Sequence, residues 1–213
     1  MTYNTYLFDF DGTLVDSMPA FVGLMLRILD ENDMKYDNDI VKIITPLGYG
    51  GTAKYFRLIG LDKSEEELVS TMNKYAYEEY AYNIPAKNNV IKVLETLRQN
   101  GASLNILTAS PHTVLDVCLE RLGIFGLFDN VWSCEDFGTT KADTNIYKMA
   151  AERLGKAVEE VLFLDDNLNA DKTAKESGMK VCGVYDDSSK ECSEEMKKVA
   201  DYYIYDFSQL LEI

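Results

Sequence analysis

The sequence predicts an α/β protein in which a doubly wound parallel sheet carries an inserted helical lobe. Short apolar runs alternate with longer stretches whose apolar residues recur every three or four positions. Glycine or asparagine follows several of these longer stretches, as at a helix end. One long segment, residues 16–85, has helical periodicity without a convincing strand. Because parallel strands need crossover connections and are covered on both faces, the alternating part predicts helices on both sides of a sheet.

The apolar runs are the predicted strands, and the predicted helices lie between them. Ile91, Leu94 and Leu97 share one face of a helix over 88–100, which Asn100-Gly101 ends. We expect Ser110-Pro111 to open the next helix and Gly123 to end it. The predicted strands are 6–8, 104–107, 131–133, 161–164 and 180–184, with 202–204 as an edge strand, and two more helices are predicted over 143–154 and before Gly178.

Residues 16–85 are predicted to form a helical domain inserted into a core made of residues 1–15 and 86–213. Ser64 and Glu67 have the spacing of a capping box at the start of a helix. The apolar stripe that follows them is typical of core packing. A chain of 213 residues is long enough for one full core and such a lobe.

Composition limits the function classes. Hydrophobic residues make up 46% and charged residues 27% of the chain, as in globular proteins. The net charge is −15 and no basic block is present, so nucleic acid is not an expected partner. No N-terminal export signal or membrane span is visible, which favours a cytoplasmic protein. Independently of this, a monomer or a homodimer is expected. The four cysteines lack the spacing of a zinc site and are expected to be free thiols: Cys118, Cys134, Cys182 and Cys192.

Polar residues gather at the predicted carboxyl ends of the strands, where open parallel sheets bind ligands. Because side chains alternate along an extended chain, Asp9 and Asp11 face the same way. Their counterparts after the later strands are Thr108, Ala109, Ser110, Lys141, Asp165 and Asp166. Carboxylates about 4 Å apart repel by roughly 4 kcal/mol per pair at an effective dielectric near 20. A bound cation removes this penalty, and an all-oxygen ligand set beside a phosphate substrate favours Mg²⁺.

These segments resemble, in order, the four motifs of the haloacid dehalogenase superfamily. The matching segments are DFDGT at 9–13, TAS at 108–110, Lys141 in TTKAD, and LDD at 164–166. The resemblance implies a Rossmann-like core, and the helical lobe lies where that family carries an α-helical cap. It also implies catalysis through a covalent aspartyl-phosphate.

The resemblance assigns a role to each matching residue. It implies that Asp9 is the nucleophile and a Mg²⁺ ligand, and that Asp11 is the general acid and base, with its main-chain carbonyl on the metal. Thr108 and Lys141 are expected to bind the phosphoryl group, and Lys141 also to hold Asp9. Asp165 is the expected third ligand, with Asp166 a ligand through water or a support for the others.

The acid at Asp11 favours phosphoester chemistry over dehalogenation, because a departing halide needs no proton. We therefore expect a Mg²⁺-dependent phosphatase of a small phosphorylated metabolite, similar to phosphoglycolate and sugar-phosphate phosphatases. One alternative is a sugar phosphomutase of the β-phosphoglucomutase type, although the GYGGT loop lacks the arginine with which those mutases hold the distal phosphate. Another is a non-catalytic metabolite-binding module on the same fold.

Several residues have two interpretations. Ser110 is either a helix cap or a phosphate contact. Asn169 occupies a position where the family often has an acid, and it either supports the metal or caps the next helix. The only histidine, His112, is expected to be an ordinary residue at a helix start. In the lobe, Thr52 and Lys54 follow a glycine-rich turn and are candidate substrate contacts.

Overall fold

The computed structural model describes residues 3–37 and 39–213 and divides the chain into two compact units. Unit 1 consists of Met1–Asp16 and Pro85–Ile213, and unit 2 of Ser17–Ile84. Residues 1 and 2 of the predicted core segment lie outside the described residues.

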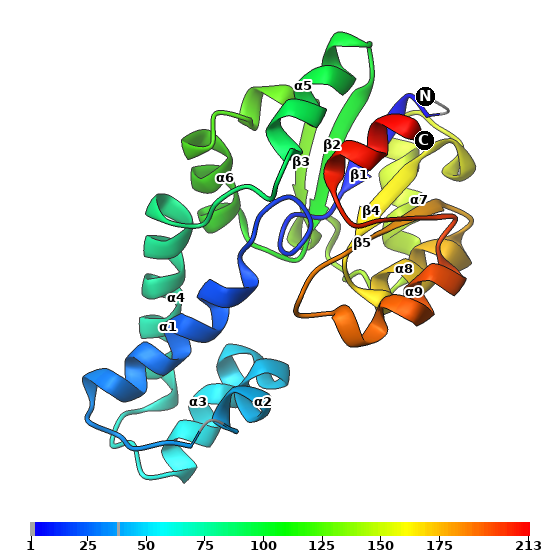
Figure 1. Ribbon diagram of the computed structural model, residues 1–213. Coiled ribbons are helices and arrows are strands. Elements are labelled where there is room, and N and C mark those ends of the chain that lie inside the picture. The colour runs from blue at the N-terminus through cyan, green and yellow to red at the C-terminus, as the bar shows by residue number, and fades with distance from the viewer. Residues whose placement is uncertain (1–2, 38) are drawn as a thin grey trace. The chain divides into compact units, whose positions relative to one another are not determined.

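Unit 1 is built on a six-stranded parallel sheet in the order β3-β2-β1-β4-β5-β6 (Figure 1). The strands are β1 (Thr5–Phe8), β2 (Ser103–Thr108), β3 (Asn130–Ser133), β4 (Leu162–Asp165), β5 (Lys180–Val184) and β6 (Tyr202–Ile204). Phe8 of β1 is in register with Ile106 of β2 and Leu164 of β4. The predicted doubly wound α/β fold is confirmed, and β6 is an edge strand as expected.

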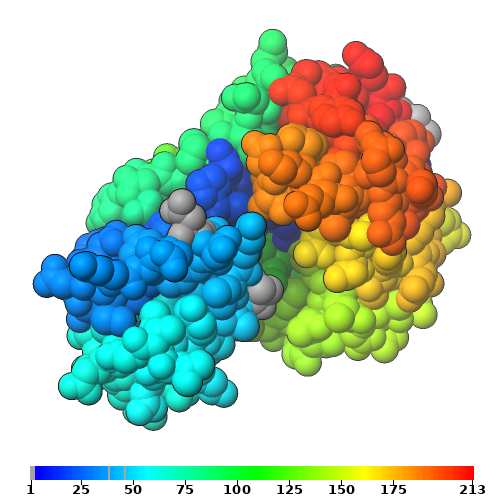
Figure 2. All heavy atoms as spheres, turned by 60° about the horizontal axis from the view of Figure 1, so that its bottom comes forward, coloured from blue at the N-terminus to red at the C-terminus, as the bar shows by residue number. Residues whose placement is uncertain are grey.

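Helices cover both faces of this sheet, with α5 and α6 on one side and α7, α8 and α9 on the other (Figure 1). Alternation along β1 explains why both faces are apolar: Leu7 packs in a core cluster with residues of α7 and α8, whereas the Phe8 ring faces Phe128 and Phe207. In Figure 2 the residues of α8 and α9 form a continuous part of the surface of unit 1. The helices are α5 (Val90–Gln99), α6 (His112–Arg121), α7 (Thr144–Arg153), α8 (Leu168–Ser177) and α9 (Ser193–Val199), with short 3-10 turns at η2 (Phe125–Leu127), η3 (Cys134–Phe137), η4 (Val158–Glu160), η5 (Lys190–Cys192) and η6 (Phe207–Glu212).

Two predicted helix starts are wrong in detail. Helix α6 begins at His112, and Pro111 is its N-cap with an extended backbone, so Ser110 does not cap it. At α8 the cap is Asn167, whose side chain accepts hydrogen bonds from the amides of Asn169 and Ala170. Asn169 already lies inside the helix, so the cap interpretation of that residue is wrong as well. At α8 the preference for an asparagine cap was correct in kind but two residues out of place, whereas no side chain caps α6.

Unit 2 is helical throughout its described residues and has a core of its own. Its helices are α1 (Met18–Glu31), α2 (Ile40–Ile44), α3 (Gly48–Leu58) and α4 (Glu65–Tyr82), with a 3-10 turn at η1 (Thr45–Leu47). Met25, Phe56 and Met72 come from different helices and are completely buried in one cluster. The predicted capping box is present, because Ser64 and Glu67 exchange side-chain hydrogen bonds with each other's amides. None of the helices in the described part of the chain has the length and apolar character needed to cross a membrane.

The two segments of unit 1 at which the chain leaves for unit 2 and returns from it, residues 14–16 and 85–87, are paired with each other. Val15 and Ala86 form an isolated antiparallel bridge. The Asp16 amide donates to the Pro85 carbonyl at 3.0 Å, and the Lys87 amide donates to the Leu14 carbonyl at 3.0 Å. The segment that leaves β1 and the segment that returns before α5 are therefore held side by side by backbone hydrogen bonds.

Candidate active site

The central position of β1 brings the predicted site residues to one edge of the sheet. β1 has β2 on one side and β4 on the other, and all three strands run in the same direction. Asp9 follows directly after β1, and its amide donates to the carbonyl of Leu164 in β4 at 2.8 Å. Thr108 and Asp165 are the last residues of β2 and β4. Strand order thus gathers three segments that are far apart in sequence.

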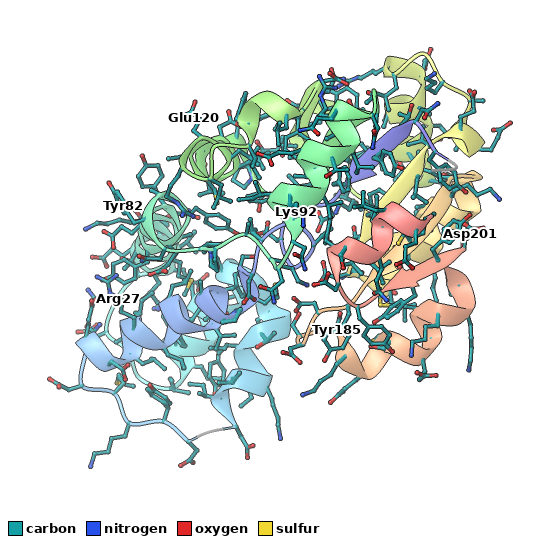
Figure 3. The ribbon with its side chains drawn as sticks, turned by 45° about the horizontal axis from the view of Figure 1, so that its top comes forward. Arg27, Tyr82, Lys92, Glu120, Tyr185 and Asp201 are labelled. Carbon is teal, nitrogen blue, oxygen red and sulfur yellow. The ribbon has the colours of Figure 1, made fainter. Side chains whose placement is uncertain are left out.

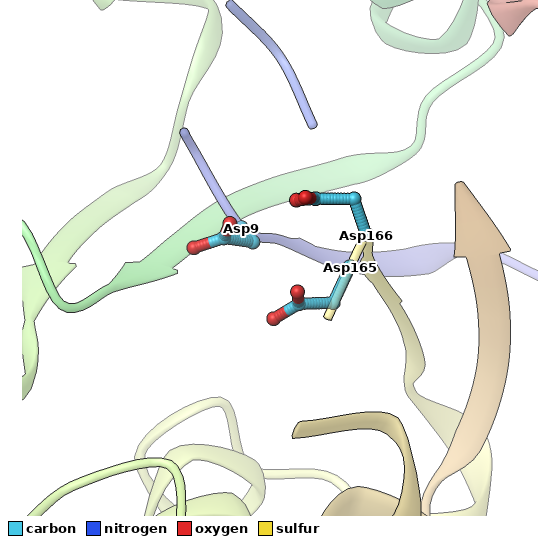
Figure 4. Close-up of side chains that lie close together, drawn as sticks. All are labelled: Asp9, Asp165 and Asp166. Atoms are coloured by element: carbon cyan, nitrogen blue, oxygen red, sulfur yellow. The ribbon is translucent and has the colours of Figure 1, made fainter. Parts of the chain in front are cut away.

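Three carboxylates form an acidic triad, which we define as Asp9, Asp165 and Asp166 (Figure 4). One oxygen of each lies within 4.8 Å of the others. All three residues are buried, with exposed fractions of 6%, 1% and 7%. At such a separation each ionised pair repels by roughly 3–4 kcal/mol at an effective dielectric near 20. The fold therefore holds together groups that need a compensating cation.

Lys141 supplies one positive charge to this triad. Its ammonium donates to Asp9 and to Asp165 Oδ2, the latter at 2.8 Å. Burial alone would lower the pKa of Lys141, but Asp165 and Asp9 raise it above its ordinary value, so the ammonium stays charged. The hydroxyl of Tyr147 contacts the Lys141 carbonyl oxygen at 3.1 Å and fixes the backbone at this position.

A single lysine does not balance the triad. Burial raises the pKa of Asp9 to about 7 in spite of Lys141, and the neighbouring Asp165 and Asp11 add to the increase. Burial also raises the pKa of Asp166 well above its ordinary value, with further contributions from Asp165 and Asp9. Buried carboxylate oxygens without a sulfur or imidazole donor suit a hard divalent cation. The donor set therefore fits such an ion, which would restore the ionised form of each acid.

Gly12 and Thr13 place the turn after Asp9 against Asp166. Gly12 has a φ of +74°, and a Cβ built on it would lie 2.5 Å from Asp166 Oδ2. Only glycine allows both this backbone conformation and this close approach. The Thr13 hydroxyl donates to Asp166 Oδ1 at 3.0 Å. The residues after the first predicted motif thus fix the orientation of an acid from the fourth.

Asp11 belongs to the same edge but points to the segment after β2. The Ser110 hydroxyl donates to Asp11 Oδ2, and the Ser110 amide donates to Thr108 Oγ1 at 3.1 Å. Thr108 is buried, whereas Ala109 between them is exposed. Ser110, predicted either to cap a helix or to contact phosphate, therefore orients the carboxylate of Asp11 in this structure.

Other sequence candidates lie elsewhere. Thr52 is completely buried in unit 2, where its hydroxyl donates to the Ile44 carbonyl at 3.4 Å, so its position does not support the expected substrate contact. Lys54 is exposed on α3 and lines a surface hollow of unit 2 that also contains Glu65 and Glu66. Asn169 is exposed and is not part of the acidic triad.

His112 lies at the start of α6 and joins two surface acids. Its Nδ1 lies 2.9 Å from Asp116 Oδ1 and its Nε2 lies 2.9 Å from Asp136 Oδ2. Hydrogen bonds to Asp116 and Asp136 raise the pKa of His112. Both ring nitrogens are occupied by carboxylates, which fits the predicted structural role of this residue.

Asp171 is a buried acid that no sequence motif indicated. It lies in the first turn of α8 with no exposed surface, and neither carboxyl oxygen has a hydrogen-bond partner among the described residues. Burial raises the pKa of Asp171 well above its ordinary value, and Asp165 and Asp166 add to this. Gly183 of β5 leaves room for it, since a Cβ there would lie 3.3 Å from Asp171 Oδ2. Helical periodicity would predict an apolar residue at this buried position of α8.

Comparison with known proteins decides the family. The family model described as haloacid dehalogenase-like hydrolase matches residues 6–184, which include the whole acidic triad, Lys141 and both halves of the Asp11–Ser110 contact. The chain belongs to this family of hydrolases. The predicted resemblance is thereby confirmed, and the protein is an enzyme of the haloacid dehalogenase superfamily.

Individual relatives show how far the likeness extends. Pyrophosphatase PpaX of Bacillus velezensis is 28% identical over 181 residues, covering 84% of this chain and 81% of that protein. The glyceraldehyde 3-phosphate phosphatase of Methanocaldococcus jannaschii is 27% identical and covers 97% and 95% of the two chains. A crystal structure of a predicted phosphoglycolate phosphatase from Haemophilus somnus superimposes with a TM-score of 0.81 at 20% identity, covering 100% and 98%. At that identity the structural likeness establishes the fold.

Proposed function

We propose that this hydrolase is a Mg²⁺-dependent phosphatase that cleaves a small phosphorylated metabolite through a phosphorylated Asp9. The observation that carries the proposal is the pairing of Asp9 with Lys141 beside Asp165, with a second acid, Asp11, two residues further on. The names of the curated relatives support phosphate chemistry, since they act on pyrophosphate or on a phosphorylated triose.

The first half-reaction transfers the phosphoryl group to the protein. A carboxylate oxygen of Asp9 attacks phosphorus, and the bond between phosphorus and the leaving oxygen breaks. Asp11 donates its proton to that leaving oxygen, and the Ser110 hydroxyl holds Asp11 in place for this role. Lys141 offsets the negative charge that the phosphoryl oxygens bring to the buried site.

The second half-reaction restores the enzyme. Asp11, now ionised, accepts a proton from a water molecule, and the water oxygen attacks phosphorus. The bond between phosphorus and Asp9 breaks, which releases inorganic phosphate and regenerates both carboxyl groups. Asp11 thus gives one proton and takes one back in each cycle.

Asp9, Asp165 and Asp166, with the main-chain carbonyl of Asp11, are the residues that would hold Mg²⁺. When bound, the ion supplies positive charge that keeps the acids ionised and offsets the charge of the phosphate. Unit 2 is proposed to act as the cap that selects the substrate, and Lys54 remains a candidate contact on it. A cytoplasmic location is proposed with this function, since small phosphorylated metabolites are the expected substrates.

A phosphatase screen tests the proposal. Purified protein with MgCl₂ is incubated with phosphoglycolate, triose and hexose phosphates, and pyrophosphate, and free phosphate is measured. We expect Asp9→Asn to lose nearly all turnover, because an amide is a poor nucleophile, while still binding Mg²⁺ weakly through the other two acids. Undiminished turnover in this variant would falsify the nucleophile assignment.

The same screen separates the two alternatives. Glucose 6-phosphate formed from β-glucose 1-phosphate and a bisphosphate primer, without free phosphate, would identify a mutase. Tight binding of one compound without any phosphate release would identify a binding module.

A further inference from the structure

Lys87 is a charged side chain of unit 1 that the proposed chemistry does not use. It lies two residues after Pro85, where the chain returns to the core, and its side chain is only 18% exposed. The ammonium donates to the carbonyl oxygens of Gly12 and Tyr185, each at 2.6 Å, and to Asp186 Oδ2 at 3.0 Å. A lysine ammonium has three donors and no acceptor, so its hydrogen-bonding capacity is fully used.

The Gly12 contact leads directly to the acidic triad. Gly12 belongs to the turn that follows Asp9, and its Cα packs against the carboxylate of Asp166 so closely that a Cβ would not fit. Thr13, the next residue, donates to the same carboxylate. Because the carbonyl and the Cα of Gly12 are parts of one rigid backbone unit, fixing the carbonyl also fixes the surface on which Asp166 rests.

The other two acceptors belong to the segment after β5, the strand beside β4. Tyr185 directly follows β5 and is labelled in Figure 3. Asp186 is 5% exposed, and its second oxygen accepts hydrogen bonds from the amide and hydroxyl of Ser188 at 2.9 and 2.6 Å. Burial would raise the pKa of Asp186, but the Ser188 hydrogen bonds and Lys87 lower it, so this acid is ionised. Its charge in turn contributes to the raised pKa of Asp166.

We propose that Lys87 is a positioning residue for the acidic triad: it clamps the Gly12 turn to the segment after β5, and thereby fixes Asp166 and the backbone between Asp9 and Thr13. The Lys87 side chain is not needed to hold residues 14–16 beside residues 85–87. Backbone contacts between Val15 and Ala86 and between Leu14 and Lys87 already do so. Its effect on turnover rests on the proposed phosphatase function, whereas its effect on the turn does not.

Amide hydrogen exchange of the metal-free protein tests the clamp without any turnover. The variant is Lys87→Met, which keeps the length and apolar stem of the side chain and removes all three donors. The matched control is Lys92→Met, because Lys92 is an exposed lysine five residues further on in α5 (Figure 3). We expect exchange at least tenfold faster for the amides of Gly12, Leu14 and Val15 in Lys87→Met, with β3 unchanged. Lys92→Met is expected to match the wild type at all of these amides.

Equal exchange of the turn amides in Lys87→Met and the wild type would overturn the proposal. If Lys87→Met fails to fold, Lys87→Leu replaces it, because leucine also removes all three donors and so carries the same expectation for the turn. Because this readout needs neither metal nor substrate, a wild-type protein without phosphatase activity would refute the proposed function and leave the result for Lys87 valid.

Mg²⁺ activation provides the functional readout. We expect Lys87→Met to raise the Mg²⁺ concentration for half-maximal activity by about tenfold, because supports of metal ligands typically contribute 10–100-fold. The double variant Lys87→Met/Asp186→Asn separates positioning from simple neutralisation. It is expected to stay impaired, since Gly12 still lacks its donor. Full recovery would show that Lys87 acts only by neutralising Asp186, and would overturn the clamp.

Discussion

Replacing Gly12 by alanine should disturb the active site through a specific contact. Two costs are expected. The first is the left-handed backbone at φ +74°, about 1–2 kcal/mol for a residue with a Cβ. The second comes from the new methyl group, which would lie 2.5–2.7 Å from three atoms of the Asp166 carboxyl group and must displace it. Displacement breaks the hydrogen bond from Thr13 to this carboxyl group, worth about 0.5–1.5 kcal/mol.

Gly101→Ala is the matched control, because it separates the two costs. Gly101 also has a positive φ, +82°, but a Cβ there would meet no atom within 4 Å. The free energy of unfolding of the control should therefore fall only by the backbone cost. This is about 0.5–1.5 kcal/mol, because alanine also makes the unfolded chain stiffer, which offsets part of the strain. We expect Gly12→Ala to lose about a further 0.5–1.5 kcal/mol of stability, from the broken hydrogen bond alone.

Urea unfolding followed by the fluorescence of Trp132 measures this difference, since the only tryptophan of the sequence lies on β3 of unit 1. Gly12→Ala should also need about tenfold more Mg²⁺ for half-maximal activity, because a displaced ligand binds the ion less well. Gly101→Ala should keep the wild-type Mg²⁺ response. Equal losses of stability in the two variants, together with a Mg²⁺ response of Gly12→Ala within twofold of the wild type, would show that the contact of residue 12 with Asp166 has no such effect.

Three further predictions concern charged groups. Lys141→Met leaves Asp9 and Asp165 facing each other without the ammonium, so the maximal rate at saturating Mg²⁺ should fall about 10²–10³-fold, and a loss below tenfold would contradict its role. Asp171 has a folded-state pKa above its unfolded value, so the wild type loses stability as pH rises above about 4. The free energy of unfolding of Asp171→Asn relative to the wild type should therefore increase between pH 5 and pH 7, by at most about 1.4 kcal/mol per pH unit. A difference in urea unfolding that does not change with pH would exclude this. His112 has a raised pKa, so the stability it contributes should be complete below about pH 6.5 and vanish as pH rises through the folded-state pKa. His112→Asn should accordingly be less stable by at most about 1 kcal/mol at pH 6, equal to the wild type at pH 9 and fully active, a small effect because the ring is partly exposed.

Local sequence signals predicted element type better than exact contacts. The apolar run at 104–107 was predicted to be a strand between two amphipathic helices, and β2 contains it. The serine of the Ser110-Pro111 pair looked like a helix cap, yet its hydroxyl donates to Asp11, which is 99 positions away. In a cap the serine oxygen accepts from an amide of its own helix, which is a local contact. Donation to a distant carboxylate depends instead on which acceptor the fold brings near.

Lys87 shows the limit of the sequence more clearly. A lysine shortly after a proline reads as an ordinary solvated residue, and nothing in its neighbourhood suggests that it contacts Gly12 and Tyr185. Those contacts span 75 and 98 positions in the chain. Asp171 is similar, because helical periodicity does not reveal that an acid lies on the buried side with unpartnered oxygens.

The sequence by itself determined the strand and helix pattern, the order of the acidic motifs and the family, because periodicity and short motifs are written in neighbouring residues. The contact of Lys141 with Asp9 was implied by the family resemblance and is present. Only the tertiary structure decided the other polar contacts of the site, Asp11 with Ser110 and Asp166 with Thr13. The physical reason is that parallel strand order, which no local segment encodes, sets which strand ends become neighbours. Electrostatic and hydrogen-bond energies then depend on separations of a few ångströms across that edge.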